Sequence, residues 1–333
     1  MVALPRKNFN FMGGEFSRVN NLALTYASEF FSDGLGSQLQ CIYGIYALSR
    51  FLDVAYIHSP IGKINYQGLA ALEKNELDPA FVSRCNEVFH IASDVEFPKT
   101  GVVCTAMSTD LDFLCAARDK AKKSDEFHLV RLGHPYPMTD KNPQMMRYVE
   151  KVAPFQASQS RVFRMALHVR RGDFFVVDPE RISPNAYYID TALNIIRILK
   201  KHKIPFLCEL YTELPSKTFT ITEEHCGIDH EKIIGTRTIT SEMCQLEDFE
   251  VLPKLQKFIN GDPIEALQSL ATADLLIMSR SSFSYVAGVL NHKGIIVSHP
   301  LWHTALPHWI TNDQGEFFEE EINECCERWA QQW

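Results

Sequence analysis

The segment Met165–Asp173, which reads MALHVRRGD, says more about the fold than any other stretch of this sequence. Its apolar first half predicts a buried β-strand over residues 163–169, and Arg170, Arg171 and Gly172 follow where that strand would end. In α/β proteins the carboxyl ends of parallel strands carry the ligand-binding groups. The segment therefore predicts a parallel sheet with an anion-binding edge.

Arginine at that edge suits a phosphate ligand. Its planar guanidinium offers two parallel charge-assisted hydrogen bonds and keeps its charge at all ordinary pH values. Adjacent residues near a strand end point in opposite directions. We therefore expect one of Arg170 and Arg171 to face the ligand and the other to pair with Asp173 and brace the turn. The alternative is a salt-bridged surface turn, because Arg-Gly-Asp triplets also arise by chance.

A second candidate anion site is the segment Ser279–Ser284 (SRSSFS), between a predicted strand over 274–278 and a predicted helix over 283–290. Free backbone N–H groups at the start of a helix attract anions, and serine hydroxyls beside them add donors. The alternative is that Ser281 or Ser282 only caps the helix, which is the commoner use of serine at such a position.

A third candidate is the turn Asp33–Ser37 (DGLGS), between a predicted strand over 21–27 and a predicted helix over 37–51 that Ser37 would cap. Gly34 and Gly36 allow a tight turn and a close approach by a ligand. The turn is not the GxGxxG fingerprint, because Leu39 stands at the third glycine position. A dinucleotide-dependent oxidoreductase is therefore disfavoured.

The order of the predicted elements describes an α/β protein. Short apolar runs alternate with longer amphipathic segments along nearly the whole chain, and its 333 residues suffice for two domains. The sequence turns polar around residues 156–160. We therefore predict two Rossmann-like, doubly wound domains facing a cleft, the first over residues 1–157 and the second over 158–333.

Composition narrows the classes of function. A net charge of −8 argues against a general binder of nucleic acid or anionic membranes. A hydrophobic content of 46% fits a globular protein, and no apolar run approaches the ~20 residues of a membrane span. The nine cysteines form no CxxC pair, which favours a reducing compartment. We expect a cytoplasmic protein, or a Golgi-lumen protein if this sequence is a trimmed domain.

The three candidate segments together resemble those of the GDP-fucose-dependent fucosyltransferase superfamily, which includes α1,2-, α1,6- and protein O-fucosyltransferases. The resemblance is carried by H-x-R-R-G-D at His168–Asp173, by the late S-x-S-S-F-S turn at Ser279–Ser284, and by the early G-x-G-S turn at Gly34–Ser37. It covers the chain from about Asp33 to His299. Ser37 stands where many relatives carry asparagine, which leaves the contact there open.

The resemblance implies a GT-B fold, with the acceptor mostly on the N-terminal domain and GDP-fucose on the C-terminal one. Arg170 would grip the β-phosphate, and Arg171 and Asp173 would hold the loop or contact the nucleotide. The other implied donor-side contacts are those of His168, Gly34, Gly36, Ser37, Ser281, Ser282 and Phe283. The implied reaction inverts the anomeric centre and uses no divalent metal and no cofactor. An arginine aimed at the departing phosphate contributes ~3–4 kcal/mol in such a site.

Several roles stay open at this stage. Asp33 is a candidate general base, or a turn-stabilising aspartate. Either Asp262 or Glu265 is the expected guanine reader, although Asp262 also suits a helix N-cap ahead of Pro263.

The acceptor side is equally open. His134 and Tyr136 are the acceptor candidates, in a proline-rich segment over 133–143 that we expect to be a surface loop. A late group of aromatic residues and histidines would line a sugar pocket or pack in the core: His299, Trp302, His303 and Trp309.

Two further functions stay open beside fucosyl transfer. One is a GT-B transferase that uses GDP-mannose or a UDP-sugar, because such enzymes also bind the donor phosphates through arginine. The other is a non-catalytic protein that binds a GDP-sugar, against which the intact set of Arg170, Arg171 and Asp173 argues.

Overall fold

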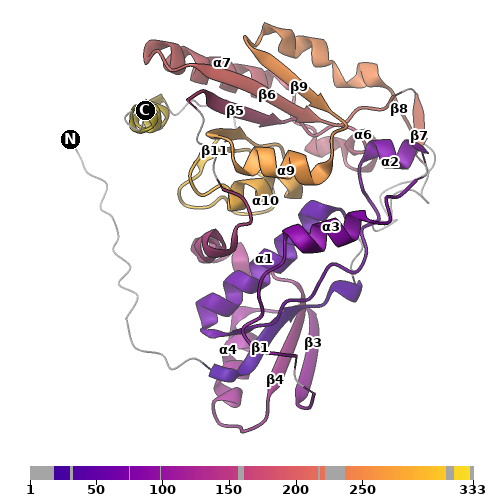
Figure 1. The fold of residues 1–333 in the computed structure, drawn as a ribbon, viewed down its shortest axis with the longest axis vertical. Helices are drawn as coiled ribbons and strands as arrows, with labels where there is room; N and C mark the ends of the chain where they lie inside the picture. Colours follow the sequence, from indigo (N-terminus) through magenta and orange to yellow (C-terminus); the bar gives the residue numbers. More distant parts are fainter. Residues whose placement is uncertain are drawn as a thin grey trace.

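The computed structural model describes residues 19–30, 33–74, 76–97, 99–156, 161–216, 218–221, 237–312 and 319–330. These residues form two parallel sheets and one small antiparallel pair of strands. Figure 1 shows the two sheets at opposite ends of the molecule, with helices from both halves of the chain between them.

The N-terminal half is a four-stranded sheet in the order β2-β1-β4-β3, and each of its strand pairs is parallel. Its strands are β1 (Val19–Tyr26), β2 (Val54–Tyr56), β3 (Val102–Ser108) and β4 (His128–His134). Its helices are α1 (Leu35–Leu52), α2 (Leu69–Lys74), α3 (Phe81–Val88), α4 (Leu111–Ala121) and α5 (Tyr136–Thr139), with 3-10 turns η1 (Ser28–Phe30) and η2 (Pro143–Val152).

The C-terminal half is a six-stranded parallel sheet in the order β12-β11-β10-β5-β6-β9. Its strands are β5 (Phe163–His168), β6 (Phe206–Thr212), β9 (Leu255–Ile259), β10 (Leu275–Ile277), β11 (Ile295–Ser298) and β12 (Ile310–Thr311), and the antiparallel pair is β7 (Phe219–Ile221) and β8 (Arg237–Ile239). Its helices are α6 (Phe174–Val177), α7 (Asn185–Lys201), α9 (Pro263–Ala271), α10 (Ser282–Leu290) and α11 (Glu319–Ala330), with 3-10 turns η3 (Pro179–Arg181), η5 (Ser241–Cys244) and η6 (Leu246–Val251).

One hydrophobic cluster joins the two halves. It runs from the N-terminal sheet through α1 to α9 and α10 of the C-terminal half, with Leu39, Ile42, Tyr285 and Val289 among its buried members. Helix α1 is buried on nearly every side because its sequence is apolar on nearly every side. A second cluster fills the space between α7 and the opposite face of the C-terminal sheet. Helix α1 thus packs directly on α10, as Figure 1 also shows.

The expected fold class is confirmed. Both halves are α/β, both sheets are parallel, and a cavity lies between the halves, which is the arrangement called GT-B. The residues of the two sheets lie on either side of the predicted boundary at 157/158, although residues 157–160 are outside the described part of the chain. The boundary itself stays a prediction.

Two local expectations were wrong. Ser37 does not cap α1, because the helix begins at Leu35 with Gly34 as the N-cap residue. The segment over 133–143 is not a surface loop, because its first residues end β4 and α5 follows directly. Pro135 and Pro137 lie at the start of that short helix, where the backbone N–H that proline lacks has no partner within the helix.

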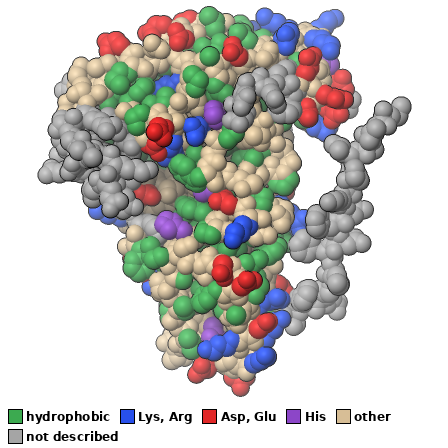
Figure 2. Space-filling view, turned by 180° about the vertical axis from the view of Figure 1, so that it is seen from behind, with side chains coloured by type: hydrophobic (Ala, Val, Ile, Leu, Met, Phe, Trp, Pro, Cys, Tyr) green, Lys and Arg blue, Asp and Glu red, His purple; other side chains and the backbone are tan. Residues whose placement is uncertain are grey.

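Charge on the described surface is mixed. On the face shown in Figure 2, acidic and basic side chains lie among one another at both ends of the molecule.

Candidate functional site

A cavity of about 400 Å³ lies between the two halves. It is bounded by the turn before α1, the segment before α2, the carboxyl ends of β5, β6 and β9, and the starts of α9 and α10. All the predicted donor-side residues line it: Gly34, Gly36, Ser37, His168, Arg170, Arg171, Asp173, Asp262, Glu265, Ser281, Ser282 and Phe283. Asp33 lines it as well. Segments far apart in the sequence therefore meet at one place.

The early glycine turn is in direct contact with the late serine turn. A Cβ atom on Gly36 would lie 2.6 Å from both the backbone N and the Cα of Phe283. Only glycine allows α1 to begin so close to the first turn of α10. Beside it, the Ser37 hydroxyl donates to Asp33 Oδ2 at 3.2 Å, which fixes this carboxylate at the cavity wall.

Arg170 is the central cation of the site. Its Nη1 donates to Glu213 Oε2 at 2.8 Å, and its Nη2 donates to Asp173 Oδ1. Its guanidinium carbon also lies 4.3 Å from the ring centroid of Phe174. Burial alone would lower the pKa of Arg170, but Asp173, the Tyr66 hydroxyl and Glu213 together raise it above its ordinary value. Arg170 is therefore a permanently charged group that two carboxylates already neutralise.

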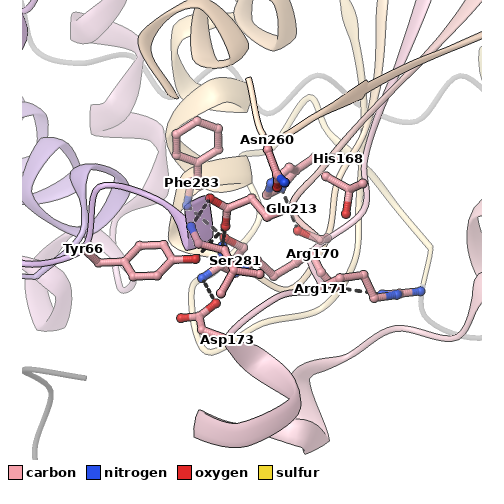
Figure 3. A network of polar contacts seen from close by, with 12 residues as sticks. Tyr66, His168, Arg170, Arg171, Asp173, Glu213, Asn260, Ser281 and Phe283 are labelled. Carbon is pink, nitrogen blue, oxygen red and sulfur yellow. Dashed lines mark hydrogen bonds and ion pairs between the residues drawn. The ribbon is translucent and has the colours of Figure 1, made fainter. Parts of the chain in front are cut away.

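Glu213 ties this arginine to the N-terminal half of the chain. The Tyr66 hydroxyl donates to Glu213 Oε2 at 2.7 Å, and the backbone N–H of Leu69 donates to Oε1 at 3.1 Å. Figure 3 shows Tyr66 reaching from the N-terminal half toward Glu213 and Arg170. Gly68 has φ +110°, and a Cβ there would lie 2.8 Å from Glu213 Oε1. A glycine is thus required where the loop passes the carboxylate.

Arg171 points away from this cluster, as Figure 3 shows. Its Nη1 donates to the carbonyl oxygen of Arg170 at 2.8 Å, and its Nη2 donates to Asn185 at the start of α7. The two arginines do diverge, as expected. Arg170 is the arginine that pairs with Asp173, and it is also the one to which the family resemblance assigns the phosphate contact. Which of the two arginines faces the ligand stays a prediction.

Asp173 is buried at the start of α6. Burial raises the pKa of its carboxyl to about 6, even though the Arg170 charge acts in the opposite direction. Asp173 therefore braces the turn through Arg170, and its charge is held less firmly than that of an exposed aspartate.

His168 ends β5 and is buried against the serine turn. Its Nδ1 lies 2.9 Å from Ser279 Oγ and 2.5 Å from Ser284 Oγ, and its ring centroid lies 5.3 Å from that of Phe283. Burial, and then the Arg170 charge, lower the pKa of His168 to about 3. The imidazole is therefore neutral at physiological pH and joins β5 to the start of α10.

The serine turn contains both of the features that its sequence allowed. Ser281 is the N-cap residue of α10, and its Oγ accepts from the N–H of Phe283 at 3.2 Å, so the capping role is confirmed. Ser281, Ser282 and Phe283 all face the cavity as well. The first turn of a nine-residue helix, whose N–H groups have no partner within the helix, thus lies at the cavity wall.

The two candidate guanine readers differ in what they already bind. Asp262 is the N-cap of α9, accepts from the N–H groups of Ile264 and Glu265 at 2.8 and 3.2 Å, and pairs with Arg84 of the N-terminal half at 2.8 Å. Among the described residues, the exposed carboxylate of Glu265 has no hydrogen-bond or ion-pair partner. Glu265 is therefore the carboxylate that is available to a ligand.

The two acceptor candidates lie outside the cavity wall. The Tyr136 hydroxyl donates to the backbone oxygen of Ser37 at 3.3 Å, which places it behind the glycine turn. His134 lies beside Tyr136, with ring centroids 5.2 Å apart, and burial lowers its pKa despite the opposing charge of Asp33. Their role toward an acceptor stays a prediction.

The late aromatic group separates into two kinds of residue. His303 and Trp309 are buried, and His299 packs on Tyr187 with ring centroids 4.3 Å apart. Trp302 instead has 53% of its surface exposed and lines the cavity.

Sequence reasoning missed Glu213, Tyr66 and Arg181, all of which line the cavity. Glu213 lies two residues beyond the predicted strand over 206–211, so the same strand-end rule would have found it. Tyr66 lies in a segment without a motif, and only its contact with Glu213 marks it.

The described residues contain neither a cluster of metal ligands nor a membrane-spanning helix. No three His, Cys, Asp or Glu side chains within the described ranges converge as metal ligands would. In the same ranges, no helix combines the length and the apolar composition that crossing a bilayer requires. The eight cysteines that the structure describes are all free thiols, and Cys226 lies outside the described residues.

No protein-family model matches the chain, and the comparison with curated protein sequences gives no match either. Among solved structures, the chain is similar to ADP-heptose LPS heptosyltransferase II from E. coli, at 11% identity and a TM-score of 0.37, over 93% of this chain and 99% of that one. It is also similar to Arabidopsis thaliana FUT1 in complex with GDP, at 13% identity and a TM-score of 0.38, over 86% and 73% of the two chains. A third is the fucosyltransferase NodZ from Bradyrhizobium, at 10% identity and a TM-score of 0.31, over 81% and 93%. Likenesses this remote leave the function to be argued from the residues of the cavity.

Proposed function

We propose that this chain is an inverting glycosyltransferase that moves fucose from GDP-fucose to a sugar hydroxyl. One observation carries the proposal. The strand end with Arg170, the serine turn at Ser281 and the glycine turn at Gly36 come from distant parts of the sequence and line a single cavity. Each supplies a feature that a nucleoside diphosphate needs: a fixed guanidinium, a helix N-terminus and a close backbone approach.

The diphosphate would lie between Arg170 and the first turn of α10. The cavity is otherwise rich in carboxylates: three arginines face it (Arg170, Arg171, Arg181), against five acids (Asp33, Asp173, Glu213, Asp262, Glu265). Both terminal nitrogens of Arg170 already donate to carboxylates, so a phosphate that takes the two-pronged contact replaces an anion there. Glu213 is the carboxylate that can be replaced, because Tyr66 and the Leu69 N–H continue to hydrogen-bond it after it leaves Arg170.

The guanine base would lie toward β6, β9 and α9. Tyr211 and Phe258 stack there, with ring centroids 4.8 Å apart and an interplanar angle of 8°, and both line the cavity. Glu265 lies at the start of α9 on the same wall. A carboxylate accepts from the N1–H and 2-amino groups of guanine, and adenine and uracil lack that pair of adjacent donors. This favours a guanosine diphosphate over other donors.

In the transfer step, the acceptor oxygen would displace GDP at the anomeric carbon with inversion. Negative charge grows on the departing β-phosphate, and Arg170 is already in place to stabilise it, an effect worth ~3–4 kcal/mol in comparable sites. Asp33 is the candidate base for the acceptor hydroxyl. With Arg170 and the start of α10 supplying positive charge, the proposed reaction requires no divalent metal and no cofactor.

Ligand-dependent thermal stability tests the donor. We expect GDP and GDP-fucose to raise the melting temperature and UDP and ADP to leave it unchanged, with and without EDTA. A ligand at a hundredfold excess over its Kd stabilises the folded state by ~2.7 kcal/mol. A shift with UDP alone would indicate a different nucleotide sugar, and loss of the GDP shift in EDTA would overturn metal independence.

Arg170→Ala tests the central residue. It should abolish the GDP shift and fucosyl transfer, and Arg170→Lys should restore little of either, because a point charge cannot replace the bidentate fork. Arg197→Ala is the matched control, since Arg197 is exposed on α7 and does not line the cavity. Near-normal transfer by Arg170→Ala would overturn the proposal.

A further inference from the structure

We infer that Trp302 is the platform on which an acceptor sugar ring packs, so that the acceptor is a glycan that presents an apolar C–H face. This inference rests on the proposed function and names the acceptor class for the same cavity. Trp302 is 53% exposed, although tryptophan is ordinarily well buried, and it lines the cavity that contains Arg170. An indole exposed at a cavity wall presents an apolar face on which a sugar ring can pack.

The indole is held in place by a chain of partly buried hydrogen bonds. Trp302 Nε1 donates to His303 Nε2 at 2.5 Å, and His303 Nδ1 lies 3.1 Å from Asp140 Oδ1. The Asp140 carboxylate assigns the proton to Nδ1, which leaves Nε2 free to accept from the indole. His303 is buried and Asp140 belongs to the N-terminal half, so both halves of the chain fix the orientation of Trp302.

One face of the indole is already covered. The guanidinium carbon of Arg181 lies 4.0 Å from the ring centroid of Trp302 and 4.3 Å from that of Phe174. Phe174 is in turn 4.3 Å from the guanidinium carbon of Arg170. The result is an ordered stack of Arg170, Phe174, Arg181 and Trp302. Because Arg181 covers one face of Trp302, a sugar ring would pack on the opposite face.

The direction of this stack fits the proposed reaction. Arg170 would hold the leaving phosphate, and Trp302 stands at the far end, two side chains away. In a displacement with inversion the acceptor approaches from the side opposite the leaving group. The donor fucose lies next to the phosphate, so a ring packed on Trp302 is the next sugar along. Arg181 beside it offers N–H donors to the hydroxyl groups of that ring.

Trp302→Ala and Trp302→Phe are the paired variants that test the platform, with the melting temperature checked for each. The phenyl ring of Trp302→Phe keeps an apolar face on which a sugar can pack, whereas the methyl group of Trp302→Ala does not. With GDP-fucose and methyl β-D-galactopyranoside or methyl N-acetyl-β-D-glucosaminide, we expect Trp302→Ala to raise the acceptor KM about tenfold, the scale of one aromatic stacking contact. Trp302→Phe should recover most of that loss. The KM for GDP-fucose and the Kd for GDP should stay unchanged in both variants.

Saturation-transfer NMR with the same two methyl glycosides and GDP-loaded protein tests the inference without turnover. C–H protons of one sugar face should receive saturation from the wild type and from Trp302→Phe, and not from Trp302→Ala. Equal saturation in Trp302→Ala, or none in the wild type, would overturn the inference. So would a raised KM for GDP-fucose with an unchanged acceptor KM, which would assign Trp302 to the donor sugar. Failure of the wild type to bind GDP is a separate result, because it would overturn the proposed function itself.

Discussion

Glu213 lies against Arg170 at 2.8 Å, on the side of the guanidinium that faces the N-terminal half. This carboxylate thus shares with Asp173 the neutralisation of the proposed phosphate-binding group, and it also joins the two halves through Tyr66 and the Leu69 N–H. If phosphate replaces Glu213, the strength of this ion pair sets the affinity for the nucleotide.

Glu213→Gln should therefore tighten GDP binding. The amide keeps an oxygen that accepts from Tyr66 or Leu69, but it no longer competes as an anion for Arg170. A partly buried charge pair of this kind is worth about 1 kcal/mol, so the Kd for GDP should fall roughly fivefold. Isothermal titration calorimetry at constant ionic strength measures the Kd for GDP in the wild type and the variant. Unchanged or weaker binding would mean that Glu213 is not the anion displaced.

Gly36→Ala should destabilise the fold and weaken GDP binding together. The new Cβ would lie 2.6 Å from backbone atoms of Phe283, and neither helix can move freely, so a loss of about 1–3 kcal/mol is expected. Gly34→Ala is the matched control, because its Cβ meets only Tyr66 at 3.8 Å and its φ of −61° suits any residue. Urea unfolding of both variants gives the comparison. Equal stability would show that α1 and α10 are not in such close contact.

His168 should make the chain less stable in acid. Its pKa falls from an ordinary 6.5 to about 3 on folding, so between these values the unfolded state binds a proton that the folded state does not. Stability then falls as pH is lowered through this range, by up to about 1.4 kcal/mol per pH unit. His168→Gln should flatten that part of the profile in urea unfolding between pH 5 and 7.5. An identical slope in the variant would show that folding does not lower the pKa of His168.

Glu265→Gln should reduce recognition of the base and spare that of the phosphates. Inosine diphosphate lacks the 2-amino group of guanine, so the wild type should bind it more weakly than GDP by about 1–3 kcal/mol. In Glu265→Gln the GDP affinity should fall and the preference for GDP over inosine diphosphate should largely vanish. If Glu265→Gln still preferred GDP over inosine diphosphate, a group other than Glu265 would recognise the guanine base. Asp262→Asn is the contrasting variant, expected to lower the stability of α9 through its cap and its Arg84 pair.

Much of the site was predictable because one rule applies to every parallel sheet. Strands end at a shared edge, so motifs at the ends of β5 and β10 had to meet, and His168, Arg170 and Ser281 do meet. Helix α1 was predicted from its apolar sequence. That sequence is apolar on nearly every side because α1 is buried between the two halves.

What could not be predicted depends on contacts between distant segments. Tyr66 has no motif around it, and its position follows from the conformation of Gly68 and from Glu213 on the other half. The prolines at 135 and 137 were interpreted as loop signals, although proline is equally compatible with the first turn of a helix. Trp302 and Trp309 look alike in the sequence, and only packing separates the exposed indole from the buried one.

The hydrophobic cluster that runs from the N-terminal sheet through α1 to α10 has a consequence for how the chain behaves as a whole. Two domains that share one apolar interior cannot swing apart as rigid bodies without exposing it to water. We therefore expect the width of the opening between them to change little, and substrates to enter and leave by local movement at its edge. For the same reason the halves should melt in one cooperative transition, and a fragment cut near residue 157 should be insoluble on its own.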